Sequence, residues 1–239
     1  MQFDDIGMTF PDGTTALESV SFDVAPGEFV TIVGPSGCGK STLLRIASGL
    51  ETPTRGTCAI DRDSIGFVFQ DSTLLPWRTV QRNVELFAEL HGEDRTECAR
   101  RATEAIELVG LGGFADKYPR QLSGGMKMRA SLARSLVMKP RVFLFDEPFG
   151  ALDEMTRERL NDELLAIFSR ERFAGVFVTH SIAEAVYMST KVLVMSARPG
   201  RIVSSIDVHF DYPRSHELRY EPAFAALCGE VSAALRVAS

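Results

Sequence analysis

One segment of the chain has the residue types and the spacing to bind phosphate groups. Residues 34–42 read GPSGCGKST and fit the pattern G-x-x-x-x-G-K-[ST]. Glycines let successive backbone N–H groups turn toward an anion, and a helix that starts directly after them adds its favourable dipole. In such a loop Lys40 would reach the β- and γ-phosphates of ATP, and Ser41 would bind Mg²⁺. The residues expected to contact the nucleotide here are Gly34, Pro35, Ser36, Gly37, Cys38, Gly39, Lys40, Ser41 and Thr42.

The alternative for this segment is an ordinary glycine-rich turn. Its surroundings favour the phosphate-binding loop, because an apolar, β-branched stretch precedes it at residues 28–33 and helical spacing follows at 41–50. The thiol of Cys38 is expected to point away from the phosphates, and its place near a helix start would make it open to alkylation.

Two adjacent carboxylates, Asp146 and Glu147, follow the apolar run 142–145. Buried carboxylates are unfavourable unless cations or waters meet them, and a magnesium nucleotide would supply the cation. Alternation along a strand would send the two side chains in different directions, so Asp146 can bind the metal while Glu147 polarises the attacking water. Such a pair alone is more often a surface feature. Together with the phosphate-binding loop it indicates catalysis.

A second helix start suited to anions begins at the segment LSGGM, residues 122–126. Ser123 is expected to cap the helix, and Gly124 and Gly125 leave its N-terminus open to a ligand. The chain therefore carries a second anion-binding helix start, distant in sequence from the first.

The composition is that of a globular cytosolic protein. The 239 residues are 45% hydrophobic, with a net charge of -6 and a pI near 5.3, which gives no general attraction to nucleic acid. The start of the chain lacks the pattern of a secretory signal, and no apolar run is long enough to span a bilayer. The four cysteines have neither CxxC spacing nor nearby histidines, so free thiols are expected.

The elements that would position these groups form an α/β pattern. Strands are predicted at residues 28–33, 65–70, 142–145, 176–179 and 192–195, and their apolar character indicates a parallel sheet covered on both faces. Between residues 71 and 139 the pattern is helical, with amphipathic stretches at 78–91, 95–109 and 126–139. A last helix is expected at 223–236. The chain is therefore predicted to be an α/β core with an inserted helical lobe.

The motifs and their order resemble those of one family, the nucleotide-binding subunits of ABC transporters, whose signature is LSGGQ. The resemblance covers nearly the whole chain and implies a P-loop NTPase fold, a RecA-like core with an antiparallel β edge. It implies a single ABC ATPase domain over 1–239, with the core at 1–70 and 140–205, the helical lobe at 71–139 and a short extension at 206–239.

The resemblance also assigns roles to single residues. Phe10 stands where the family has an aromatic residue that stacks on adenine, with Phe3 as the alternative. Gln70 matches a glutamine that senses Mg²⁺ and the attacking water, and His180 matches a histidine that contacts the γ-phosphate. Asp153 ends the Ala-Leu-Asp segment that crosses to a second subunit. Considered singly, Gln70 and His180 would be ordinary structural residues; their places after predicted strands favour the functional roles.

Two residues that differ from the family's usual pattern and two further segments narrow the resemblance to one branch of the family. Met126 replaces the usual glutamine of the signature, and Met128 stands where related chains often have a second glutamine. Activity should survive, since Ser123, Gly124 and Gly125 make the phosphate contacts. Met126, the segment LLPWRTV at 74–80 and the segment SARPGRI at 196–202 look like the branch that imports nitrate, sulfonates and taurine.

Leu74, Leu75 and Trp77 would be unusual on an exposed surface. One interpretation places them near a groove that receives a helix of a membrane permease, where aromatic residues are enriched. The other, equally weighted for Trp77, packs them inside the helical lobe.

The resemblance implies a head-to-tail homodimer that encloses two ATP molecules, each between the loop of one subunit and Ser123 of the other. Its further partners would be permease subunits and, indirectly, an extracytoplasmic solute-binding protein, and the chain would lie on the inner face of the cell membrane. The main alternative is a soluble ABC-type ATPase of translation or DNA repair, which usually has two nucleotide domains or a long coiled coil. A kinase or GTPase would not need Ser123, and a scaffold without activity would have lost Lys40 or Glu147.

Overall fold

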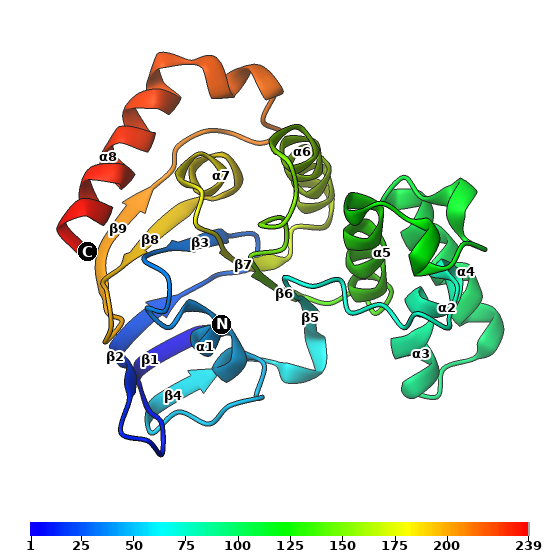
Figure 1. Cartoon of the computed structure of the whole chain (residues 1–239), viewed down its shortest axis with the longest axis horizontal. Coiled ribbons are helices and arrows are strands. Elements are labelled where there is room, and N and C mark those ends of the chain that lie inside the picture. Colours follow the sequence, from blue (N-terminus) through cyan, green and yellow to red (C-terminus); the bar gives the residue numbers. More distant parts are fainter. Residues whose placement is uncertain (239) are drawn as a thin grey trace.

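A computed structural model describes residues 1–238, apart from the side chain of Asp63. Its centre is a six-stranded sheet in the order β5-β6-β7-β3-β8-β9 (Figure 1). Neighbouring strands run parallel except β9, which runs antiparallel to β8. The strands are β3 (Phe29–Val33), β5 (Ile65–Val68), β6 (Val142–Asp146), β7 (Ala174–Val178), β8 (Lys191–Met195) and β9 (Ile202–Asp207). The α/β fold expected from the sequence is confirmed.

Side-chain alternation along the buried strands divides the core between the two faces of the sheet. In β6, Phe143 and Phe145 face one apolar cluster, whereas Val142 and Leu144 face the other. The helices α6 (Glu154–Glu171), α7 (Ile182–Met188) and α8 (Pro222–Ala238) pack with the phenylalanine face, and α1 (Lys40–Ala47) packs on the opposite face (Figure 1). Because both faces are covered, every residue of β3 and β7 is buried.

A smaller antiparallel sheet lies beside α1, in the order β2-β1-β4 (Figure 1). It consists of β1 (Gln2–Thr9), β2 (Thr15–Asp23) and β4 (Arg55–Ala59). The sequence pattern does not reveal these strands, because irregularities between Phe3 and Thr9 shift the register of β1 against β2 and interrupt the alternation. This sheet is the antiparallel edge that the family resemblance implies.

The helical lobe stands to one side of the large sheet (Figure 1). Its helices are α2 (Val80–Val84), α3 (Leu86–Leu90), α4 (Arg95–Leu108) and α5 (Gly124–Leu136). The single helix predicted over residues 78–91 is divided into α2 and α3 at Glu85. Within residues 1–238, no helix is both long and apolar enough to cross a membrane.

Candidate functional site

The phosphate-binding loop connects the end of β3 to the start of α1. The Nζ atom of Lys40 donates hydrogen bonds to the carbonyl oxygens of Gly34, at 2.9 Å, and Pro35, at 3.1 Å. Gly39 has a φ of 105°, and a Cβ added there would lie 2.6 Å from Cδ2 of Leu17. Only glycine satisfies both conditions, so the motif's glycine at this position is required by the backbone itself. Ser36, Gly37 and Ser41 are exposed, while Gly34, Pro35 and Thr42 are partly buried.

The expectation that the thiol of Cys38 is open to alkylation is wrong. Its side chain is 1% exposed, and Sγ lies 3.8 Å from Nζ of Lys40. A reagent in solvent cannot reach this thiol in the conformation described, although the position near a helix start favours reactivity.

The turn between β8 and β9 contacts the phosphate-binding loop and supports its backbone. Nε and Nη2 of Arg198 donate hydrogen bonds to the carbonyl oxygen of Gly37 at 3.1 and 3.0 Å. Gly200 packs so closely that an added Cβ would lie 2.0 Å from the carbonyl oxygen of Cys38. In the sequence this segment is only a marker of the nitrate, sulfonate and taurine branch, because no local spacing reveals a contact between residues 161 positions apart.

Ser41 and Asp146 meet at the carboxyl edge of the sheet. The hydroxyl of Ser41 donates a hydrogen bond to Oδ1 of Asp146 at 2.8 Å. Burial raises the pKa of Asp146, while the hydrogen bond from Ser41 opposes that change. A cation placed here would relieve the desolvation of the carboxylate.

Glu147 leaves the strand in a strained conformation. β6 ends at Asp146, and Glu147 has a φ of 45°, which is uncommon for a residue with a side chain. Its amide donates to the carbonyl oxygen of Val178 at 3.0 Å, and its Oε2 lies 3.5 Å from Nδ1 of His180. The two carboxylates thus have different neighbours, but the left-handed turn, rather than strand alternation, separates them. The side chain of His180 is 55% exposed.

Among the described residues, neither Gln70 nor Asp153 forms a hydrogen bond or an ion pair with Asp146 or Glu147. Gln70 follows β5, whose end is paired with that of β6, and its side chain is exposed. Asp153 caps α6, where its Oδ1 accepts a hydrogen bond from the amide of Thr156 at 3.0 Å. That hydrogen bonding lowers the pKa of Asp153.

The second anion-binding feature lies on the helical lobe, at the start of α5. Ser123 caps this helix by accepting a hydrogen bond from the amide of Met126 at 3.3 Å. Ser123 and Gly124 are exposed. A Cβ at Gly125 would lie 2.9 Å from Cγ2 of Thr156, so a larger residue would collide with α6. Met128, one of the two departures from the signature, is 5% exposed and belongs to the core.

Phe10 and Phe3 have different environments. Phe10 is partly buried in the turn between β1 and β2. Phe3 is 2% exposed, and its ring stacks on that of Phe22 with 4.2 Å between the centroids. The alternative in which Phe3 stacks on adenine is therefore wrong, since no face of that ring is free.

Two buried polar residues fix the loop that follows Gln70, and sequence reasoning identified neither. Arg134 of α5 is 4% exposed and donates hydrogen bonds to the carbonyl oxygens of Ser72 and Thr73. The side chain of Asn83 is fully buried and bonds both the amide and the carbonyl of Leu75. A single arginine or asparagine in an amphipathic pattern indicates an exposed helix face, so the sequence contains no signal for these contacts.

A groove of about 560 Å³ runs between this loop and α5. Its walls include Gln70, Leu74, Arg120, Lys127 and Leu152. Trp77, which lies in the same loop, is 70% exposed. The interpretation that packs Trp77 inside the lobe is wrong; Leu74, in contrast, packs against the core.

The residues at the carboxyl edge fit Mg²⁺ and a nucleotide. Mg²⁺ prefers oxygen ligands and is usually bound by one or two protein groups together with substrate phosphates and waters. Ser41 and Asp146 place two oxygens together beside the loop. Within residues 1–238 there is no cluster of three or more His, Cys, Asp or Glu side chains that could hold a metal ion alone.

Comparisons with known proteins agree with this geometry. Residues 17–150 match the family described as ABC transporter. The aliphatic sulfonates import ATP-binding protein SsuB of Bacillus subtilis is 43% identical over 220 residues, which cover 89% of this chain and 84% of that protein. The nitrate import ATP-binding protein NrtD of Synechocystis is 42% identical over 234 residues, covering 92% and 88%. A dimeric, post-hydrolysis structure of the ATP-binding cassette MJ0796 with ADP and Pi has a TM-score of 0.76 and 32% identity, covering 88% and 99%.

Proposed function

Because the chain belongs to the ABC transporter family, in which it is an ATP-binding subunit, we propose that it hydrolyses ATP to power the import of a small solute. The relatives named for sulfonate and nitrate import support nitrate, sulfonates or taurine as the solute class. The proposal treats residues 1–239 as one ATPase domain made of the α/β core, the helical lobe and a C-terminal extension.

One observation carries the proposal: the phosphate-binding loop and the anion-binding start of α5 lie on different parts of the fold, the α/β core and the helical lobe. The loop before α1 belongs to the core, whereas Ser123 caps the start of α5 on the helical lobe (Figure 1). Ser123 and Gly124 are nevertheless exposed, as a helix start that receives a ligand must be. A second copy placed head to tail would bring its Ser123 to the nucleotide on this loop, and the dimeric MJ0796 cassette is similar in structure.

Each residue of the site then has a definite task. Lys40 exchanges the carbonyl oxygens of Gly34 and Pro35 for phosphate oxygens, and the amides of the loop surround the β-phosphate. Ser41 and Asp146 would hold Mg²⁺, which would neutralise charge on the phosphates when bound. Glu147 would accept a proton from the attacking water. His180, whose Nδ1 lies 3.5 Å from Oε2 of Glu147, would contact the γ-phosphate.

Three residues have roles that rest more on the family than on contacts. Gln70 would reach Mg²⁺ and the water once a nucleotide is bound, because it stands at the end of β5 next to β6. Phe10 would stack on adenine from the β1–β2 turn. Asp153 would cross to the second copy from the start of α6, where Met155 is 83% exposed.

The exposed Trp77 and the groove beside it supply the contact with a permease. A helix of the membrane subunit lying in the groove would cover Leu74 and Trp77, and aromatic side chains of this kind are common anchors at interfaces. Arg134 and Asn83 would keep that surface rigid. This contact would hold the chain on the inner face of the membrane, with an extracytoplasmic solute-binding protein acting indirectly.

Solute uptake in a deletion strain tests this function. Cells lacking the gene are expected to lose uptake of labelled nitrate, taurine or an alkane sulfonate, and the wild-type gene should restore it. The Lys40→Ala variant, produced at the same level, should not. If uptake of nitrate, taurine and the alkane sulfonate all persist in the deletion strain while the purified chain hydrolyses ATP, the proposed solute class is wrong.

A further inference from the structure

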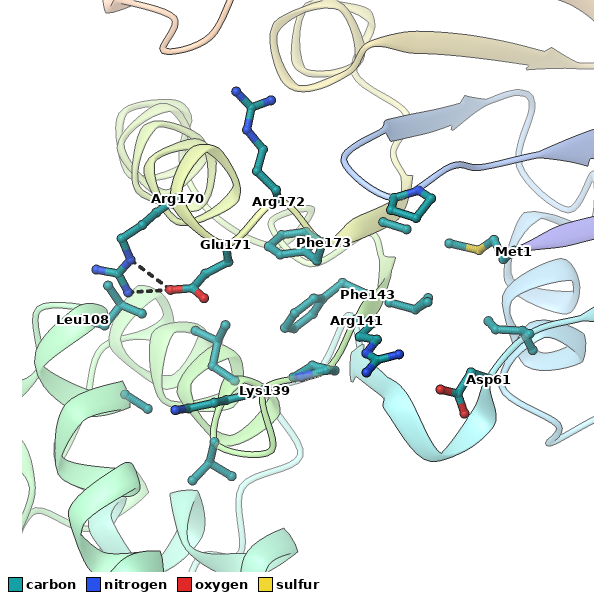
Figure 2. A pocket seen from close by; sticks show the side chains of 18 of the residues that line it. Met1, Asp61, Leu108, Lys139, Arg141, Phe143, Arg170, Glu171, Arg172 and Phe173 are labelled. Carbon is teal, nitrogen blue, oxygen red and sulfur yellow. Dashed lines mark hydrogen bonds and ion pairs between the residues drawn. The ribbon is translucent and has the colours of Figure 1, made fainter.

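A cavity of about 760 Å³ lies between the core and the helical lobe (Figure 2). The core contributes residues that precede or begin β6 and β7, among them Arg141 and Phe173, and α4 and α5 contribute Leu108 and Leu136. The phosphate-binding loop follows the carboxyl end of β3, which runs parallel to β7. The cavity therefore lies at the opposite edge of the sheet from the nucleotide site.

The floor of the cavity is apolar. Phe143 and Phe173 lie against each other with 4.4 Å between their ring centroids (Figure 2), and Ala105, Leu108 and Leu136 of the lobe also line the cavity. This surface would favour a compact hydrocarbon group, and the volume is within the range of about 300–1,000 Å³ that is typical of small-molecule sites.

The rim carries more free positive than negative charge. Arg170 is paired with Glu171 at 2.9 Å, and Glu104 is paired with Arg100. Lys139, Arg141 and Arg172 also line the cavity, and none of them has an ion pair among the described residues. Arg172 extends away from the floor, whereas Lys139 and Arg141 flank it (Figure 2). The one unpaired carboxylate of the described lining is Asp61, on the side of Arg141.

We propose that this cavity binds a small organic anion, a carboxylate or sulfonate with an apolar body. The apolar body would lie on Phe143 and Phe173, and the anionic group would meet Lys139 and Arg141 at the rim. An inorganic anion would leave the apolar floor uncovered, and a neutral hydrocarbon would leave the cations without a partner. The bound molecule would contact both the core and the lobe, so it stabilises the arrangement in which the two bodies enclose it.

Titration of the full chain with 1-anilinonaphthalene-8-sulfonate tests the site, since this probe is an aryl sulfonate that fluoresces in apolar surroundings. Excess ADP keeps the probe from the nucleotide site. We expect saturable binding at one site, displacement by hexane-1-sulfonate, and much weaker displacement by 1-hexanol. The bound probe should also raise the Tm, because it binds the folded state.

Variants of the two cations separate binding from folding. Arg141→Gln should weaken probe binding about two- to fivefold, the range for one exposed charge pair. Lys139→Gly should do the same without loss of stability, because Lys139 has a φ of 50°, which glycine adopts more readily. Arg95→Gln, on an exposed arginine of α4 with no ion pair among the described residues, is the matched control and should bind the probe as wild type does.

Three results would overturn the proposal. Saturable probe binding that is seen without ADP but is absent in excess ADP would place the probe at the nucleotide site. Equal affinity of the wild type, Arg141→Gln and Lys139→Gly would show that the rim cations do not bind the anion. Absence of saturable binding would show that the cavity takes no such molecule.

Discussion

The hydroxyl of Ser41 donates a 2.8 Å hydrogen bond to Asp146, a residue 105 positions away in the sequence. The contact joins the first residues of α1 to the last residue of β6. It places an alcohol and a carboxylate, both suited to Mg²⁺, beside the loop that would hold the phosphates.

Replacement of Ser41 tests the metal site. Ser41→Ala should raise the Mg²⁺ concentration needed for half-maximal ATP hydrolysis by at least about 10-fold, because even outer-shell groups contribute about 10- to 100-fold to metal affinity. Ser48→Ala is the control, since that hydroxyl bonds only the carbonyl of Arg45 at the end of α1. An unchanged Mg²⁺ requirement in Ser41→Ala would remove Ser41 from the metal site.

Replacement of Glu147 tests the catalytic base. Glu147→Gln should retain ATP binding and lose about 10²- to 10⁴-fold in turnover, because the amide cannot accept the proton of the attacking water. Steady-state ATPase and calorimetric ATP titration measure the two effects separately. Glu230→Gln, on the exposed face of α8, should leave both unchanged. Turnover near wild type in Glu147→Gln would mean that another group is the base.

Replacement of Gly200 tests the brace behind the phosphate-binding loop. Gly200→Ala would place a Cβ 2.0 Å from the carbonyl oxygen of Cys38, so the loop must shift. We expect a loss of about 1–3 kcal/mol in the free energy of unfolding, measured by urea denaturation, together with weaker ATP binding. In α8, a Cβ at Gly229 meets nothing within 4 Å, so Gly229→Ala should gain about 0.5–1 kcal/mol. Wild-type stability and ATP affinity in Gly200→Ala would contradict this packing.

Glu184 gives the stability a predictable pH dependence. Burial raises the pKa of this carboxyl, although the hydroxyl of Thr179 donates a hydrogen bond to it. The native state therefore keeps a proton that the unfolded chain releases near its ordinary pKa of 4.5, and ionisation at higher pH destabilises the fold.

Glu184→Gln should accordingly unfold at a higher temperature than the wild type at pH 8, with the difference shrinking as the pH falls toward the unfolded pKa. Thermal unfolding between pH 5 and pH 8 measures this trend. A difference that is constant over the range would show that the wild-type carboxyl does not titrate with folding. Glu217→Gln, on an exposed carboxylate whose pKa is lowered, should show no gain at high pH.

The sequence by itself determined the features whose chemistry is local. The phosphate-binding loop, the capped start of α5 and the buried strands each depend on residues that are neighbours in the chain, so their types and spacing suffice to predict them. Bulges hid β1 and β2, because an interrupted alternation has no period to detect.

Only the tertiary structure decided the features that depend on contacts between distant segments. The pairing of Ser41 with Asp146, the brace of Arg198 on Gly37, the burial of Phe3 and the exposure of Trp77 each depend on which surfaces the fold brings together. The cavity between the core and the lobe is of the same kind, since its cations come from turns and its floor from strands and helices of both bodies. Sequence spacing does not indicate such packing, because the whole fold determines which side chains become neighbours.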